Sequence, residues 1–295
     1  MRSDAVAIAS PLTRARDYVT LAKPRLNFLV VVSTLAGYAM AGTEGLGLLR
    51  LIGTLLGTGL VAGGASAFNQ VLERDVDALM HRTRMRPMAD QRLQPIEGNL
   101  FGAAIAITGV LMLAASANLL AAAVALTTLV TYVAIYTPLK RRSSFGTVIG
   151  AIPGAFPPLI GWAAARGDLT ADAWTLFGIV FLWQLPHFLA IAWIYREDYA
   201  RAGFPMLPVI EPDGRSTGRQ AVLYAAALVP LSLAPTLMGL TGKFYFAGAL
   251  ILGMIFVALT IRFARTRVVG DARRVFFASI IYLPLIWTLM IVDKL

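Results

Sequence analysis

Apolar runs of about twenty residues alternate with short polar segments along most of the chain, and a helix of that length crosses the hydrocarbon core of a bilayer. Nine such runs occur, at residues 26–43, 48–70, 100–117, 119–138, 145–165, 172–194, 220–241, 244–261 and 274–292. We therefore expect an all-α membrane protein, built as a nine-transmembrane-helix bundle. The residues before the first run do not follow the pattern of a cleavable signal, so we expect that run to be retained.

The composition supports the membrane prediction and removes several kinds of chemistry. Of the 295 residues, 58% are hydrophobic and 14% are charged, which lies outside the range of soluble globular domains. Cysteine is absent, which excludes disulfides, thiolate nucleophiles, zinc–thiolate sites and iron–sulfur clusters. The two histidines are too few for a histidine-rich metal site.

The net charge is +10, and the basic residues are concentrated in alternate segments between the expected spans. The segment before the first run and the segments after the second, fourth, sixth and eighth runs together carry 22 of the 26 Lys and Arg residues. The positive-inside rule then predicts a cytoplasmic N-terminus and, after nine spans, a C-terminus on the outside. The basic charge is explained by a lipid bilayer, and we expect no nucleic acid partner.

No linker or low-complexity segment divides the chain. We expect a cytoplasmic N-terminal tail, residues 1–22, followed by a single transmembrane domain, residues 23–295. The second and sixth runs each end in an acidic segment, whereas the fourth and eighth each end in a basic one. This four-helix period indicates two similar halves and a ninth helix. It would place both acidic segments on opposite walls of a central cavity open to the cytoplasmic side.

The first acidic segment carries the clearest candidate chemistry. Asn69, Glu73 and Asp77 are spaced by four residues, so on a helix they fall on one face, within about 80° of arc. Carboxylates at a membrane boundary are costly, which favours a functional role. Their oxygen donors suit Mg²⁺, which usually keeps water ligands and bridges to substrate phosphates. Asp75 falls on another face, where we expect a salt bridge with a neighbouring arginine.

Basic residues accompany this motif. Guanidinium and ammonium groups would bind the diphosphate oxygens that Mg²⁺ leaves free, or an acidic head group. The alternative is that these residues only set the topology of the chain. The candidates for binding are the basic residues Lys23, Arg25, Arg74, Arg82, Lys140, Arg141 and Arg142, with Tyr136 beside them.

The second acidic segment and one histidine are further candidates. Glu197 and Arg201 have the spacing of a surface ion pair, whereas Asp198 is the better candidate for a functional carboxylate. His187 lies inside the sixth run, about two turns from its end. An ionisable residue within a span is a functional candidate, but a histidine that is simply hydrogen-bonded between helices is an equally good interpretation.

These residues resemble a known family. Asn69-x3-Glu73-x3-Asp77 is similar to the first aspartate-rich motif of the UbiA-type intramembrane prenyltransferases. Between residues 23 and 209, further segments resemble the haem O synthase branch of that family, and beyond them only the helix pattern agrees. These segments are Lys23-Pro24-Arg25, Tyr136-Thr137 with Leu139 to Arg142, Val148 to Trp162, Trp183-Gln184 with Pro186-His187-Phe188, and Asp198-Tyr199 with residues 202–203 and 205–208. Two positions depart from the pattern: Glu73 replaces the usual Asp, and Ala202 stands where many members have a second aspartate.

The resemblance implies a reaction and its participants. The farnesyl group of farnesyl diphosphate would be transferred to a vinyl group of protoheme IX (haem B), with water supplying a hydroxyl, to give haem O for terminal oxidases. It implies Mg²⁺ as the cofactor, held by the catalytic residues Asn69, Glu73, Asp77 and Asp198. The basic candidates would contact diphosphate or haem propionates, and His187 would bind haem iron or steer water. It also implies a bacterial-type cytoplasmic (inner) membrane and, as further partners, other haem-biosynthesis or oxidase-assembly proteins.

Three rival functions share parts of this pattern. A prenyltransferase for an aromatic acid or a chlorin would have the same first motif, but the segments 140–142 and 186–188 argue against it. A transporter would be expected to carry ionisable residues near mid-membrane, whereas these acids lie at helix ends. A structural assembly factor would have no use for the acidic clusters.

Overall fold

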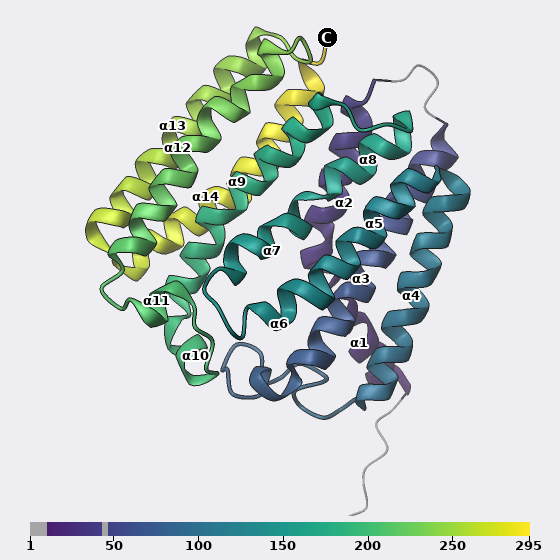
Figure 1. Cartoon of the computed structure of the whole chain (residues 1–295), viewed down its shortest axis with the longest axis vertical. Coiled ribbons are helices and arrows are strands. Elements are labelled where there is room, and N and C mark those ends of the chain that lie inside the picture. Colours follow the sequence, from purple (N-terminus) through teal and green to yellow (C-terminus); the bar gives the residue numbers. More distant parts are fainter. Residues whose placement is uncertain (1–10, 43–46) are drawn as a thin grey trace, which may run out of the picture.

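The computed structural model describes residues 11–42 and 47–295. In these parts the chain is a bundle of helices packed side by side (Figure 1). Residues 1–10 of the expected tail, Arg2 among them, and residue 43 of the first expected span lie outside the described residues. The helices are α1 (Pro11–Ala22), α2 (Pro24–Met40), α3 (Leu48–Asp77), α4 (Pro95–Ser116), α5 (Leu119–Val130), η1 (Thr131–Tyr136), α6 (Thr137–Leu139), α7 (Gly146–Ala155), α8 (Pro157–Arg166), α9 (Ala171–Ile194), α10 (Arg196–Arg201), α11 (Leu207–Ile210), α12 (Arg215–Leu237), α13 (Lys243–Thr266) and α14 (Val269–Val292).

Each expected span corresponds to one helix or to an interrupted helix. Within the described residues, eight helical segments are long and apolar enough to cross a membrane, and the bent pair α1 and α2 would make a ninth. The two members of this pair meet at an angle of 43°. The prediction of an all-α membrane protein is confirmed, and the chain is a multi-pass membrane protein.

Two spans are interrupted by proline. The fourth span runs through α5, η1 and α6, where η1 is a π-helical turn that ends two residues before Pro138. Proline has no amide N–H and its ring clashes with the preceding helical turn, so the wider π-turn accommodates it. The fifth span divides into α7 and α8 at Phe156-Pro157.

Glycine allows α2 and α8 to pack with their backbones in contact. A Cβ added at Gly161 would overlap the carbonyl oxygen of Thr34, and one added at Gly37 would overlap that of Pro158. In a membrane the close approach of small residues replaces the hydrophobic effect as the main source of helix association. The buried rings of Tyr38 and Trp162, each 1% exposed, flank this contact.

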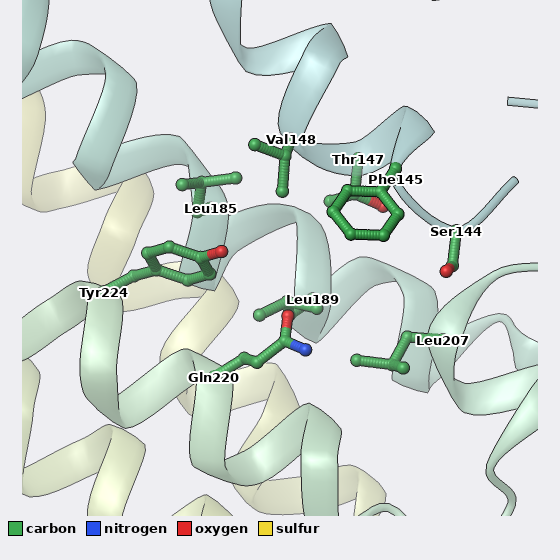
Figure 2. A pocket seen from close by; sticks show the side chains of 9 residues that line it. All are labelled: Ser144, Phe145, Thr147, Val148, Leu185, Leu189, Leu207, Gln220 and Tyr224. Carbon is green, nitrogen blue, oxygen red and sulfur yellow. The ribbon is translucent and has the colours of Figure 1, made fainter. Parts of the chain in front are cut away.

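A cavity of about 110 Å³ lies between α7, α9, α11 and α12 (Figure 2). Apolar side chains such as Val148, Leu185 and Leu189 form much of its lining, with Gln220 and Tyr224 as polar members. Since one water molecule occupies about 30 Å³ in the liquid, this space holds only a few small groups. None of the acidic candidate residues lines it.

The two ends of the bundle differ in character. We call the end formed by the C-terminus of α3, residues 78–94, α10 and α11 the polar end; the C-terminus of the chain lies at the opposite end (Figure 1). Helix α1, within the expected tail, packs at the polar end through the buried Leu21, which lies in an apolar cluster with Ala67 and Val71 of α3. At the opposite end the Lys294 ammonium donates to the carbonyl of Ala39, at 2.7 Å.

Gly161→Ala is expected to lower thermal stability by roughly 1–3 kcal/mol, because the new methyl group would force α2 and α8 apart. Thermal unfolding of the purified protein in detergent measures this. Gly270→Ala is the matched control, since a Cβ there meets nothing within 4 Å. Equal melting temperatures for the two variants would contradict the assignment of this close contact.

Candidate active site

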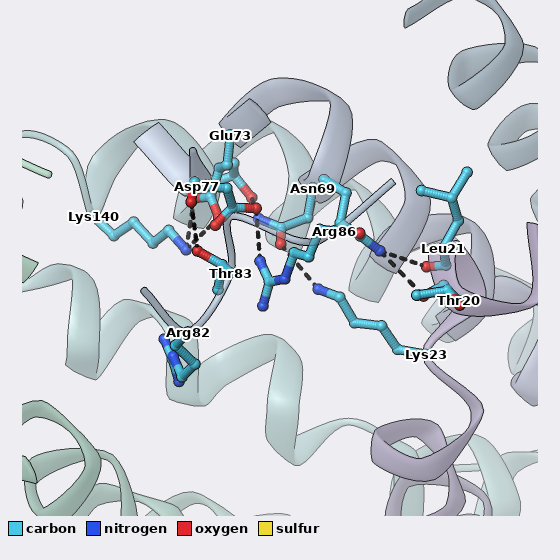
Figure 3. A network of polar contacts seen from close by, with 12 residues as sticks. Thr20, Leu21, Lys23, Asn69, Glu73, Asp77, Arg82, Thr83, Arg86 and Lys140 are labelled. Atoms are coloured by element: carbon cyan, nitrogen blue, oxygen red, sulfur yellow. Dashed lines mark hydrogen bonds and ion pairs between the residues drawn. The ribbon is translucent and has the colours of Figure 1, made fainter. Parts of the chain in front are cut away.

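The polar end is organised around three side chains of α3. Because α3 continues to Asp77, beyond its apolar run, the spacing of four keeps Asn69, Glu73 and Asp77 on one face, as the sequence predicts (Figure 3). All three are buried, with exposed fractions of 2%, 2% and 1%. Two carboxylates therefore lie side by side in the interior, where each needs a compensating charge.

Cations from other segments supply that charge (Figure 3). The ammonium group of Lys140, just after α6, lies 2.6 Å from Glu73 Oε1 and 2.7 Å from Oε2. The Arg86 guanidinium, from the segment after α3, donates to Asp77 Oδ2 at 2.7 Å. Burial lowers the pKa of Lys140, but the neighbouring Glu73 carboxylate outweighs burial and the net pKa is raised. Lys140 therefore remains charged beside its carboxylate.

Lys23 comes from the break between α1 and α2. Its backbone is left-handed, with φ of 47° and ψ of 56°, a conformation that is costly for a residue with a side chain. The Lys23 ammonium donates to Asn69 Oδ1 at 3.4 Å. The amide of Gln70, the next residue of α3, donates to the carbonyl of Leu21 at 3.0 Å and so fixes the break beside α3. The bend between α1 and α2 thus positions the Lys23 ammonium beside Asn69.

The π-helical turn orients the amide of Asn69. The hydroxyl of Thr137 donates to the carbonyl of Tyr132 at 2.9 Å, so its oxygen accepts from Asn69 Nδ2 at 3.3 Å. This directs Asn69 Oδ1 away from η1 and towards Lys23. The ring of Tyr136 lies 5.4 Å from the ammonium of Lys140, within cation–π range. The interruption of the fourth span therefore serves the polar network directly, as π-turns often do at functional sites.

Asp198 connects the second acidic segment to the first. Its carboxylate accepts from the backbone amides of His81 and Arg82, both at 3.3 Å, and pairs with Arg201 at 3.0 Å. Burial raises the pKa of Asp198, but these hydrogen bonds and the Arg201 charge together hold it below its usual value. The Arg82 guanidinium lies 4.8 Å from the ring centroid of Tyr195. The two acidic segments meet at the polar end, and Arg201 pairs with Asp198 instead of Glu197.

The donor set suits a hard divalent cation. In the described part of the chain, no three Asp, Glu or His side chains form a group that could hold a metal ion, so a site at Glu73 and Asp77 would need a further ligand such as Asn69. The Oδ1 atom of Asp77 is buried and has no hydrogen-bond partner. An unpaired buried carboxylate oxygen is costly, and a bound cation would satisfy it. The ligand role of Asp198, whose oxygens hold backbone amides, stays a prediction.

Other candidate residues lie outside this network. Arg25, Arg141 and Arg142 are exposed, and Arg74 pairs with Asp75 on the exposed side of α3 at 3.3 Å, which confirms the expectation for Asp75. His187 lies on α9 beside α14, apart from the α3 carboxylates in its contacts.

Three residues of the network were absent from the sequence-based candidates: Gln70, Arg86 and Thr137. The alternation of arginines after Asp77 was a signal for Arg86. Thr137 stood in the Tyr136-Thr137 segment that resembles the family, but without a role of its own. Nothing in the local sequence distinguished Gln70, because its partner lies on a distant segment.

The UbiA prenyltransferase family profile matches residues 30–281 of the chain. The chain belongs to the UbiA prenyltransferase family. A relative from Solibacter usitatus (strain Ellin6076) named protoheme IX farnesyltransferase is 48% identical, with 95% of this chain and 99% of the relative covered. A relative of the same name from Koribacter versatilis (strain Ellin345) is 43% identical, with 95% and 93% covered. The predicted family resemblance is confirmed.

Solved structures show that this UbiA-family chain also shares the fold. A structure of digeranylgeranylglyceryl phosphate synthase superposes with a TM-score of 0.79 at 16% identity, covering 95% of this chain and 98% of that one. A UbiA homologue from Archaeoglobus fulgidus bound to GPP and Mg²⁺ gives a TM-score of 0.67 at 16% identity, covering 93% and 99%. At such low identity the likeness concerns the arrangement of helices.

Lys140→Met should destabilise the protein by roughly 3–5 kcal/mol, because it leaves the buried Glu73 carboxylate without its cation. Adding Glu73→Gln should recover much of the loss, since the buried charge is then removed as well. Thermal unfolding in detergent measures both effects, with Lys243→Met, an exposed lysine, as the control. A double variant no more stable than Lys140→Met would show that the two side chains are not coupled.

Proposed function

We propose that this chain is a protoheme IX farnesyltransferase, which makes haem O from haem B and farnesyl diphosphate. The observation that carries the proposal is the match to relatives of that name at 48% and 43% identity over nearly their full length. The network at the polar end supports it, because buried oxygen donors surrounded by cations suit a diphosphate held together with a metal ion.

The reaction balances with water as the third reactant. The bond between C1 of the farnesyl group and the diphosphate oxygen breaks, and its electron pair leaves with the diphosphate. The terminal carbon of the haem vinyl group bonds to C1, and the adjacent vinyl carbon takes the hydroxyl of water while the remaining proton is released. The barrier lies mainly in the departure of the anionic leaving group, so electrostatic stabilisation is the chief requirement.

The α3 side chains and their cations meet that requirement. Asn69, Glu73 and Asp77 would hold Mg²⁺, which supplies charge stabilisation to the departing diphosphate when bound. Lys23, from the break between α1 and α2, contacts Asn69, and Lys140, just after α6, contacts Glu73. Both would contact the remaining diphosphate oxygens. Arg86 would leave Asp77 when the metal binds there and would also contact the diphosphate.

The α10 segment would support the same step from the facing wall. Asp198 holds the backbone at Arg82, and the Arg82 guanidinium also donates to the hydroxyl of Tyr199 at 3.1 Å. Asp198 would thereby position Arg82 for the diphosphate, with direct metal binding as its second proposed role. Tyr136 would line the site beside Lys140.

The acceptor and the membrane orientation complete the proposal. The polar end would face the cytoplasm in an inner membrane, with the C-terminus on the outside, because most Lys and Arg residues flank the spans at the polar end. Residues 1–22 would belong to the cytoplasmic side and residues 23–295 would form one catalytic domain. The exposed Arg25, Arg141 and Arg142 and the half-buried Arg74 would bind haem propionates, and His187 would bind haem. Haem-biosynthesis or oxidase-assembly proteins would be further partners.

Purified protein in detergent should convert haem B and farnesyl diphosphate to a farnesyl-plus-water adduct, detected by mass spectrometry. The adduct should disappear when EDTA removes the divalent cation. Asp77→Ala should lower turnover by about 100-fold or more with folding retained, because a metal ligand is lost. Asp75→Ala, on the same helix but 82% exposed in its side chain, is the matched control.

Other outcomes separate the rival functions. Prenylation of an aromatic acid in place of haem would keep the family and overturn the acceptor. Absence of any cation-dependent diphosphate release would contradict the enzymatic assignment. Near wild-type turnover by Asp77→Ala would contradict the metal site alone.

A further inference from the structure

A second polar cluster links α9 to α14 inside the bundle. The Nδ1 atom of His187 lies 2.7 Å from the hydroxyl oxygen of Ser279. That hydroxyl donates its hydrogen to the carbonyl of Phe276 at 2.6 Å. A serine hydroxyl has one hydrogen and a backbone carbonyl has none to give, so the Ser279 oxygen must act as the acceptor towards His187. The Nδ1 atom of His187 therefore carries a hydrogen.

This arrangement fixes the chemistry of the opposite ring nitrogen. A neutral imidazole with hydrogen on Nδ1 has its lone pair on Nε2, the atom available to a metal. We propose that Ser279 is a positioning residue that holds His187 in this tautomer and so presents Nε2 to the iron of the haem substrate. The proposal rests on the function proposed above and assigns the haem-iron ligand and its support.

Packing around the ring keeps it in one orientation. The ring of His187 stacks on Phe276 with centroids 5.0 Å apart and on Trp183 at 5.6 Å. The indole N–H of Trp183 donates to the backbone carbonyl of Ser279 at 2.8 Å, which ties the same two helices together. Rotation of the imidazole would lose both stacking contacts and the hydrogen bond. A histidine that binds a metal is usually held in this way, through an acceptor at its other nitrogen.

The surroundings also suit a flat apolar ligand. The ring of Phe188 lies 5.8 Å from His187, so three aromatic side chains gather at this position, with Trp183 and Phe276. Binding sites for aromatic ligands are lined mainly by such side chains, with a few placed polar groups. His187, Phe188 and Phe276 are each half-buried and Trp183 is almost completely buried, so the histidine keeps part of its surface accessible.

The test is the absorption spectrum of haem B bound to the full chain in detergent, in both oxidation states of iron. Wild type should show imidazole ligation. His187→Gly should lose this signature, and added imidazole should restore it. Ser279→Ala should weaken haem binding by about 10-fold or more, the usual cost of losing the support of a metal-binding histidine, whereas Ser279→Thr should retain it. Ser232→Ala removes another buried hydroxyl, bonded to Tyr282 of α14, and is the matched control.

The outcomes separate this inference from the proposed function. A wild-type spectrum that persists in both His187→Gly and Ser279→Ala would overturn the inference, while continued formation of the farnesyl adduct would leave the proposed function intact. Loss of ligation in His187→Gly with no change in Ser279→Ala would overturn the role of Ser279. Failure of the wild type to bind haem, together with absence of adduct, would overturn both.

Discussion

Glu73 and Asp77 are almost completely buried on α3. Glu73 takes its compensating charge from Lys140, which is distant in sequence, and Asp77 takes it from Arg86 in the segment that follows α3. Removing a carboxylate from water costs several kcal/mol, and only close cations offset that cost. The polar end is therefore arranged so that cations reach one face of one helix. The irregular backbone at this end follows from that requirement.

Interruptions of helices place polar partners beside the α3 side chains. The break after α1 places Lys23 beside Asn69, and the π-turn in the fourth span brings Thr137 to the same amide. With an uninterrupted helix at either place, Lys23 or Thr137 would no longer lie beside Asn69. In a membrane such irregular backbone is tolerated where protein packs against it; α1 and the π-turn both pack against α3, and the π-turn also packs against α7.

The second half of the chain contributes in two separate places. At the polar end, Asp198 holds the backbone that follows α3, so the position of Arg82 depends on α10. Deeper in the bundle, α9 and α14 are joined through Trp183, His187 and Ser279. Under the proposals made above, the first place would bind the diphosphate and the second would bind the haem, so the two substrates would contact different groups of helices.

The sequence by itself determined the helical class, the boundaries of most spans and the shared face of Asn69, Glu73 and Asp77, because hydropathy and a spacing of four depend only on local helix geometry. It also contained the family motif. Only the tertiary structure decided that Arg86, Thr137 and Gln70 join the network, that Asp198 holds backbone amides, and that Ser279 accepts from His187. Apart from Asp77 and Arg86, the residues in these contacts are about fifty or more positions apart in the sequence. A local sequence pattern does not specify which distant side chain a buried polar group will contact.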